Sequence, residues 1–214
     1  MKVIDLYCGL GGWARGLKDT GHDVTGYDII DFSESYPGKF IKADLLTYND
    51  FPHADVIVAS PPCTDFSKAS FPPTWTAVKL YPPNIPSAME LFNRVYEIVA
   101  LTSAKYYIIE NVVGAQKYMG KARMHIGSRY FWGNFPAFTN RVSSRNGVFD
   151  GMDIRYLTPL ECERLMGWED NWTKYGINEK GETIELSDNC RYNLIGNGVV
   201  PQVVREIISK EVME

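Results

Sequence analysis

A cysteine follows two prolines at the end of a predicted buried strand. Residues 55–60 (Asp-Val-Ile-Val-Ala-Ser) are largely apolar, and Pro61-Pro62-Cys63 comes next. Two prolines restrict the backbone and present the next side chain rigidly, at the strand end where open α/β sheets place their sites. A thiolate there can add to carbon 6 of a pyrimidine, which turns carbon 5 into a nucleophile. The alternative, a buried apolar cysteine, is common for a lone cysteine but disfavoured at this position.

A carboxylate ends a later predicted strand. Residues 105–110 (Lys-Tyr-Tyr-Ile-Ile-Glu) have strand character, and Asn111-Val112 follow Glu110. Cytosine accepts a nucleophile more readily when its ring nitrogen 3 is protonated, and a carboxyl group whose pKa is raised by desolvation can supply that proton at neutral pH. A helix-capping or salt-bridging glutamate is the alternative. The presence of Cys63 at the end of the preceding strand favours an acid paired with a nucleophile.

Glycines follow the first predicted strand, in the run Asp5-Leu6-Tyr7-Cys8-Gly9-Leu10-Gly11-Gly12. Gly9, Gly11 and Ala14 satisfy the loose spacing of dinucleotide sites, where backbone approaches a ligand at the positive end of a helix. Asp28 ends the next predicted strand, about where a ribose-binding carboxylate belongs. This segment alone predicts an adenosine-containing cofactor, without separating a nicotinamide from S-adenosylmethionine, and a structural turn is the alternative.

The elements that position these residues alternate between strands and helices, as a mostly parallel α/β sheet requires. Strands are predicted at residues 2–7, 23–28, 40–44, 55–60, 105–110 and 129–132. Helices are predicted at residues 12–20, 87–103, 158–166 and 199–212. In the second of these, Ser87 is the expected N-cap, with Glu90 at capping-box spacing. A hairpin turn is expected near residues 179–182.

Composition bounds the class of protein. The chain has 214 residues, 45% hydrophobic and 22% charged, which suits one globular domain over residues 1–214. It contains no apolar stretch of about 18 residues, so we expect no membrane span, and the first strand leaves no room for a signal peptide. The four cysteines form no CxxC pair, which indicates no zinc site and a reducing, cytoplasmic setting. A net charge of −4 means that any nucleic-acid contact needs a local basic patch.

Taken together, these motifs resemble the ordered motifs of the cytosine carbon-5 DNA methyltransferases. The matching segments occur in the family's order along nearly the whole chain: residues 5–12, 27–28, 43–44, 61–63 with 66–67, 110–112, 157–167 and 196–201. The resemblance implies a Rossmann-like S-adenosylmethionine-dependent fold with flanking helices. It further implies methylation of cytosine in DNA through a covalent Cys63 adduct, with S-adenosylhomocysteine as the product and no metal.

The resemblance also implies a role for each matching residue. Cys63 would be the nucleophile, Glu110 the acid and Arg129 an orienting residue. The residues expected to bind the cofactor are Asp5, Leu6, Cys8, Gly9, Gly11 and Gly12 at the methionine part, Asp28 at the ribose, Ile29 and Asp44 at the adenine, and Leu45, Pro61, Asn197 and Val199.

The chain departs from the family pattern at two short motifs. The family's Gln-x-Arg-x-Arg corresponds here to a stretch in which Arg129 survives and Gly127 stands in place of the other arginine, so a surface role for Arg129 is an equal alternative. Arg123 is a further candidate. The late Gly-Asn-Ser-Val is here Gly-Asn-Gly-Val, a milder change.

The largest departure concerns target recognition. Only residues 135–156 stand where the family inserts a recognition domain, and chains below about 40 residues rarely fold alone. This segment is therefore expected to be a vestigial or minimal recognition element. Other candidates for base and phosphate contacts are residues 171–187 and the side chains of Lys68, Trp75, Lys79, Tyr81, Arg141 and Arg145, although ordinary loop packing explains them equally well.

Three rival functions are also compatible with the sequence. The first is an RNA cytosine methyltransferase, because bases in RNA loops are accessible without a groove-reading domain. The second is a subunit that needs a DNA-recognition partner, or a non-enzymatic member. The third is a nicotinamide oxidoreductase, which would not call for Pro-Pro-Cys plus Glu-Asn-Val. Brevity suggests a restriction-related or restriction-avoiding enzyme of prokaryotic or viral origin.

Overall fold

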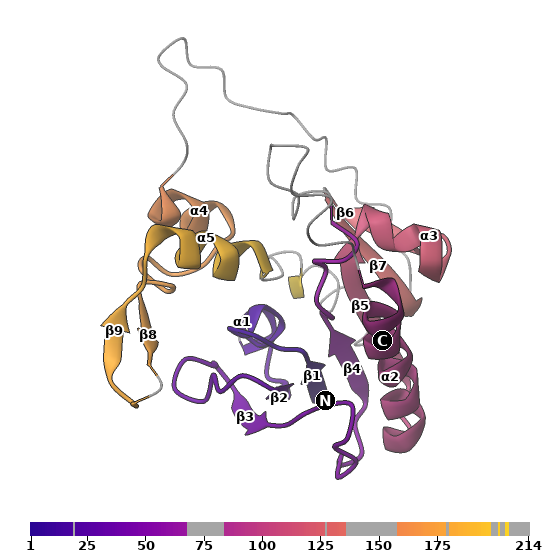
Figure 1. Ribbon diagram of the computed structural model, residues 1–214. Helices are drawn as coiled ribbons and strands as arrows, with labels where there is room; N and C mark the ends of the chain where they lie inside the picture. The colour runs from indigo at the N-terminus through magenta and orange to yellow at the C-terminus, as the bar shows by residue number, and fades with distance from the viewer. Residues whose placement is uncertain are drawn as a thin grey trace.

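A seven-stranded sheet forms the centre of the protein (Figure 1). The computed structural model describes residues 1–18, 20–67, 84–126, 128–135, 158–178, 180–197, 201 and 204–205. The strand order across the sheet is β3-β2-β1-β4-β5-β7-β6. The strands are β1 (Lys2–Leu6), β2 (Asp23–Asp28), β3 (Lys39–Lys42), β4 (Val56–Ala59), β5 (Tyr106–Val112), β6 (Met124–Ile126) and β7 (Arg129–Asn134).

The sheet is parallel except at one edge. Strands β3, β2, β1, β4 and β5 pair in parallel, while β7 pairs antiparallel with β5 and β6 antiparallel with β7. The predicted Rossmann-like, mostly parallel sheet is thus confirmed, and each predicted strand is present with its ends shifted by at most two residues. Because β1, β2, β4 and β5 run the same way, their carboxyl ends meet at one edge, where such sheets carry their sites.

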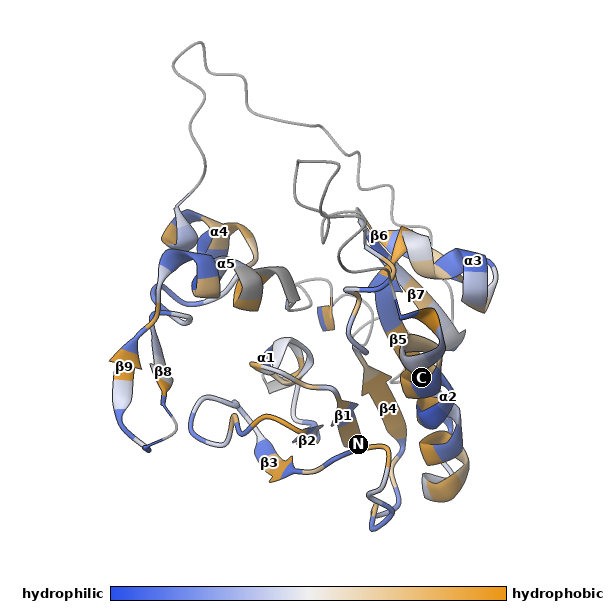
Figure 2. Cartoon of the chain, viewed as in Figure 1, coloured by the Kyte–Doolittle hydropathy of each residue, from blue (hydrophilic) through white to orange (hydrophobic). Residues whose placement is uncertain are grey.

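Helices cover both faces of the sheet, so its central strands are buried on both sides. In β4, Val56 and Val58 join the core cluster on the side of α1 (Gly12–Lys18), while Ile57 and Ala59 join the cluster on the side of α2 (Ile85–Thr102). Figure 2 shows the resulting apolar colour along β4 and β1. This two-sided burial explains why the sequence of β4 is apolar throughout instead of alternating.

Helix α2 begins earlier than the sequence predicted. Its N-cap is Asn84, whose side chain accepts a hydrogen bond from the backbone nitrogen of Ser87 at 3.3 Å, so the prediction of Ser87 as the cap was wrong. Asparagine is at least as good a cap as serine, and Pro86 is compatible with a first helical turn. At the other end Ser103 adopts a left-handed conformation with φ of 55°.

A smaller group of elements lies beside α1 (Figure 1). Thr158 caps α4 (Pro159–Leu165) in a capping box with Glu161, which confirms the predicted helix start. The predicted hairpin is formed by β8 (Tyr175–Ile177) and β9 (Thr183–Glu185). Four further elements of the described chain were not predicted: α5 (Asp188–Asn197), α3 (Gln116–Met119), the short helix Val113–Ala115 and strand β6.

A buried carboxylate holds this group together. Glu163 in α4 accepts hydrogen bonds from the backbone nitrogens of Asn171 and Thr173 at 2.8 Å and from Arg191 of α5 at 3.2 Å. An ion pair between Arg15 of α1 and Glu169 ties the group to the main sheet layer. Within the described ranges, no helix has the length and apolar character to span a bilayer.

Candidate active site

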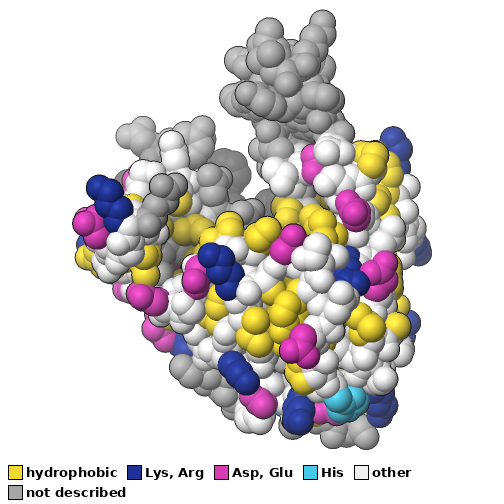
Figure 3. Space-filling view, turned by 60° about the horizontal axis from the view of Figure 1, so that its bottom comes forward, with side chains coloured by type: hydrophobic (Ala, Val, Ile, Leu, Met, Phe, Trp, Pro, Cys, Tyr) yellow, Lys and Arg dark blue, Asp and Glu magenta, His cyan; other side chains and the backbone are white. Residues whose placement is uncertain are grey.

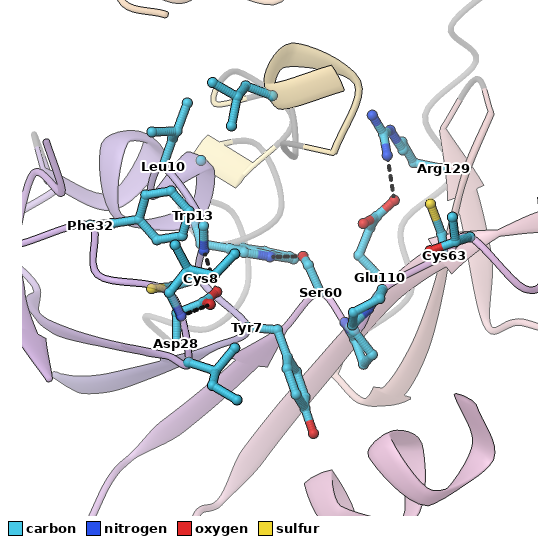
Figure 4. Close-up of a pocket in the computed structure, with 18 residues that line it drawn as sticks. Tyr7, Cys8, Leu10, Trp13, Asp28, Phe32, Ser60, Cys63, Glu110 and Arg129 are labelled. Atoms are coloured by element: carbon cyan, nitrogen blue, oxygen red, sulfur yellow. Dashed lines mark hydrogen bonds and ion pairs between the residues drawn. The ribbon is translucent and has the colours of Figure 1, made fainter. Parts of the chain in front are cut away.

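A cleft opens at the carboxyl ends of β1, β2, β4 and β5, with a volume of about 290 Å³. Its glycine half is lined by residues 7–10, 12–13, 28–30 and 32, and its cysteine half by residues 61–64 with Glu110 and Arg129. Ser60 lies between the two halves, and Leu194 of α5 also lines the cleft (Figure 4). One continuous space therefore joins the predicted cofactor residues to the predicted catalytic ones.

The three predicted catalytic residues converge in the cysteine half. Arg129 donates from Nη1 to Oε1 of Glu110 at 3.2 Å, and Cys63 lies beside this pair (Figure 4). Glu110 is 3% exposed, whereas Cys63 is partly exposed. Strand β7 brings Arg129 into place because it runs antiparallel along β5, with Arg129 opposite Val112. The arginine kept from the family motif thus contacts the predicted catalytic carboxylate instead of lying on the outer surface.

Asn111 fixes the Pro-Pro turn, a role that the sequence did not reveal. Its side-chain nitrogen donates to the carbonyl oxygen of Pro61 at 2.9 Å in a buried hydrogen bond. Asn111 and Glu110 are adjacent in β5, so their side chains point to opposite faces of the sheet. Asn111 thereby orients the turn that carries Cys63, while Glu110 faces the cleft.

The pKa values of Glu110 and Cys63 are both raised in this half of the cleft. Burial raises the pKa of Glu110, while the guanidinium of Arg129 and a hydrogen bond from Ser60 oppose that rise. Burial also raises the pKa of Cys63; the charge of Glu110 adds to this rise and Arg129 opposes it. A raised pKa makes a carboxyl group better suited to proton donation. Once protonated, Glu110 no longer opposes formation of the Cys63 thiolate.

The glycine half is shaped by an unusual turn after β1. Tyr7, Gly9 and Gly11 have φ values of 54°, 50° and 79°. A Cβ built on Gly9 meets nothing within 4 Å, so the backbone beside the cleft stays open to a ligand. At Gly11, by contrast, there is no space for a side chain, because a Cβ there would lie 2.8 Å from the ring of Tyr36.

Asp28 bridges the two loops of the glycine half. Its Oδ2 accepts from the backbone nitrogen of Gly9 and its Oδ1 from that of Ile30, both at 3.0 Å. Burial raises the pKa of Asp28, and these backbone donors oppose the rise. Ile29, the next residue, is 61% exposed and offers an apolar surface at the rim.

The predicted cofactor residues fall into three groups. The first lines the cleft: Cys8, Gly9, Gly12, Asp28, Ile29 and Pro61. The second lies elsewhere in the described part of the chain: Asp5, Leu6, Gly11, Asp44 and Leu45. Asp44 is exposed and accepts from the backbone nitrogen of Leu46 at 3.0 Å, and Leu45 is 3% exposed in the core. The third falls outside what the structure describes: the Asn197 side chain and Val199. Residues 68–83 and 136–157, which hold most of the candidates for target recognition, also lie outside the described residues.

Asp5 is buried in β1, directly before the glycine turn. It is 0% exposed and accepts a hydrogen bond from the hydroxyl of Tyr36 at 2.9 Å. Burial raises its pKa to about 8, against the opposing effect of the Tyr36 hydrogen bond. The folded protein therefore holds Asp5 in its neutral form at neutral pH, whereas an unfolded chain ionises it above about pH 4.

We expect Asp5→Asn to flatten the pH dependence of stability. Between about pH 4 and 8 the folded state binds more protons at this site than the unfolded state, so the free energy of unfolding of the wild type falls as pH rises, by up to about 1.4 kcal/mol per pH unit. Urea unfolding at pH 5 and pH 8 measures the difference between wild type and variant. The exposed Asp23→Asn is the control, and an equal slope in Asp5→Asn and wild type would contradict the assignment.

The charges on the surface are mixed. Figure 3 shows basic and acidic side chains interspersed over one face, without a single-sign field among its described residues. This agrees with the net charge of −4. Any phosphate contact on this face would need individual basic side chains, because no broad positive surface is present there within the described residues.

A family profile matches almost the whole chain. The profile described as C-5 cytosine-specific DNA methylase matches residues 1–126 and 115–212. These ranges contain Cys63, Glu110 and Arg129 as well as the glycine turn.

Curated bacterial proteins match more locally. The Type II methyltransferase M1.HphI of Haemophilus parahaemolyticus is 28% identical over 146 residues, which is 61% of this chain and 37% of that protein. The Type II methyltransferase M2.BsuMI of Bacillus subtilis is 33% identical over 75 residues, 32% of this chain and 19% of that protein. The chain thus spans less than two fifths of the length of either relative.

Two solved structures share the fold over nearly its full extent. Entamoeba histolytica methyltransferase EhMeth superposes with a TM-score of 0.61 and the S. pombe Dnmt2 methyltransferase with 0.60. Each is 14% identical, and each alignment covers 98% of this chain and 97% of the other. At that identity the likeness establishes the architecture alone.

Proposed function

Because the chain belongs to the C-5 cytosine-specific DNA methylase family, we propose that it transfers a methyl group from S-adenosylmethionine to carbon 5 of cytosine in DNA. The observation that carries the proposal is the convergence of Cys63, Glu110 and Arg129 in one cleft with the glycine turn. A nucleophile, a proton donor and an orienting cation at one strand edge are the parts that addition to a pyrimidine ring needs.

The glycine half has features that suit the cofactor. The space beside Gly9 is open, so backbone can approach the ligand closely. Asp28 offers carboxylate oxygens for ribose hydroxyls, and the exposed Ile29 offers a surface for adenine. When bound, S-adenosylmethionine would supply an electrophilic methyl group.

Cys63 and Glu110 act together on the base. The sulfur of Cys63 forms a bond to carbon 6 of cytosine, and the displaced electron pair moves through the ring to nitrogen 3. Glu110 gives its proton to that nitrogen and becomes a carboxylate, which Arg129 stabilises at 3.2 Å. Carbon 5 is then an enamine-like carbon that accepts the methyl group.

The cycle closes by reversing the same proton transfer. Solvent water takes the proton from carbon 5, and the electron pair of that carbon–hydrogen bond forms the double bond between carbons 5 and 6. The sulfur–carbon 6 bond breaks at the same time and releases Cys63 as thiolate. The proton on nitrogen 3 returns to Glu110. The rise in the pKa of Glu110 that burial causes favours this return of the proton.

Access to the target cytosine differs between duplex DNA and RNA loops. A duplex cytosine must be flipped out to reach Cys63, whereas a base in an RNA loop is already accessible. Membership of a DNA methylase family favours DNA as the substrate. Because residues 135–156 are too few for a recognition domain, a partner subunit could supply target recognition. Duplex DNA is therefore the proposed substrate, read by this chain alone or with a partner subunit.

Transfer of labelled methyl groups tests the proposal directly. We expect label from S-adenosylmethionine in unmethylated duplex DNA, located at carbon 5 of cytosine. Single-stranded DNA and tRNA serve as parallel acceptors. Label in tRNA alone would replace DNA by RNA as the substrate. Cofactor binding without transfer to any acceptor would overturn methylation by this chain alone and favour the form that needs a recognition partner.

A further inference from the structure

A hydrogen bond links helix α1 to the end of β4 at the boundary between the two halves of the cleft. Nε1 of Trp13 donates to Oγ of Ser60 at 2.9 Å, although the two residues are 47 positions apart in the chain. Trp13 is 1% exposed and packs edge-on against Phe131 of β7, with ring centroids 6.4 Å apart and an interplanar angle of 84°. Phe131 lies directly opposite Glu110 in the sheet. The indole is therefore held firmly beside the catalytic strand.

This bond fixes the direction in which Ser60 can donate. An indole N–H is a donor only, so the hydroxyl oxygen of Ser60 must be the acceptor and its hydrogen must point elsewhere. Figure 4 shows Ser60 between Trp13 and Glu110. Ala59 pairs with Ile109 in the parallel β4–β5 register, so Ser60 follows β4 at the level of Glu110, and both residues line the cleft. The Ser60 hydroxyl opposes the rise in the pKa of Glu110 that burial causes, which is the effect of a donor facing the ionised carboxyl group.

We propose that Trp13 and Ser60 are positioning residues for the catalytic proton, forming a donor chain from the indole through the hydroxyl to the carboxyl group of Glu110. The inference rests on the proposed function for its catalytic meaning. Bonds in series polarise each other, so the indole strengthens the hydroxyl as a donor. Ser60 thereby stabilises Glu110 from one side while Arg129 does so from the other.

The chain acts at the moment when Glu110 becomes charged. Transfer of the Glu110 proton to ring nitrogen 3 leaves a buried carboxylate, and fixed donors stabilise such a charge without reorganising. The ionisable groups that face Glu110 are Arg129 and Cys63, and those of the glycine half are Tyr7, Cys8 and Asp28. Ser60 is a neutral member of this set, so its removal changes proton affinity without changing net charge.

Titration of Glu110 by ¹³C NMR of side-chain-labelled glutamate tests the chain independently of turnover. Ser60→Ala should raise the pKa of Glu110 by about one unit and lower kcat about tenfold, with little change in KM for DNA. The limb of the pH–rate profile that reports Glu110 should move to higher pH. Ser60→Thr, which keeps the hydroxyl, should restore both values, and Ser87→Ala is the matched control for an exposed serine.

Trp13→Phe is the second variant for the titration of Glu110. It removes the indole donor but keeps an aromatic ring, so it should shift the pKa of Glu110 in the same direction by a smaller amount. The double variant should titrate like Ser60→Ala alone, because both changes act through one hydroxyl. An unchanged Glu110 titration in folded Ser60→Ala, or additive shifts in the double variant, would overturn the inference. The expected titration shifts without methyl transfer by the wild type would keep the donor chain and refute the proposed function.

Discussion

Cys63→Ala is expected to lower methyl transfer to less than about one thousandth of the wild-type rate, because removal of a covalent nucleophile leaves only binding and orientation. Cofactor affinity should stay close to wild type, since the glycine half is formed by other residues. Transfer of labelled methyl measures the first effect. Protection against thermal unfolding by S-adenosylhomocysteine measures the second.

The covalent step has a direct readout as well. In DNA carrying 5-fluorocytosine, carbon 5 has no proton to lose after methylation, so release of Cys63 is blocked and the protein–DNA adduct should accumulate. Mass spectrometry should locate the adduct on Cys63 in the wild type and find none in Cys63→Ala. Cys162→Ala is the matched control, because that cysteine lies in α4, outside the residues that line the cleft. An active Cys63→Ala protein would end the proposed mechanism.

The central fold was predictable because its signals are local. A strand buried on both faces is apolar throughout, which identifies β4 and the beginning of β1 from sequence alone. Parallel order then places the residues after β1, β4 and β5 at one edge, so the meeting of Cys63, Glu110 and the glycine turn followed from topology. The boundary of α2 was missed because Pro86 suggested a loop, whereas proline is tolerated in a first helical turn.

Other parts of the site depend on contacts that no local pattern reveals. The bonds from Trp13 to Ser60 and from Asn111 to Pro61 span 47 and 50 positions, so only the folded chain brings these pairs together. Asp44 was expected at the adenine from the family motif. In the structure it accepts from its own loop at Leu46, and its role in cofactor binding stays a prediction.

Glu110→Gln is expected to remove proton transfer from the site while keeping the volume of the side chain. Glutamine has nearly the same volume and can donate a hydrogen bond to ring nitrogen 3, but it cannot give up a proton there. We therefore expect kcat to fall about 10²- to 10⁴-fold, the range typical of a lost general acid. Steady-state transfer to duplex DNA measures the loss, and the exposed Glu90→Gln is the control.

The same substitution should lower the pKa of the Cys63 thiol. This second effect distinguishes the loss of a proton donor from misfolding of the site. The charge of Glu110 raises the pKa of the Cys63 thiol, so its replacement by a neutral amide lowers that pKa, while Arg129 continues to favour the thiolate. The midpoint of the pH profile for iodoacetamide alkylation of Cys63 should thus move to lower pH as catalysis is lost. An unchanged midpoint would mean that Glu110 and Cys63 are not electrostatically coupled. A misfolded site would show neither a defined midpoint nor cofactor protection, so a shifted midpoint with lost turnover is the result expected when an intact site has lost its proton donor.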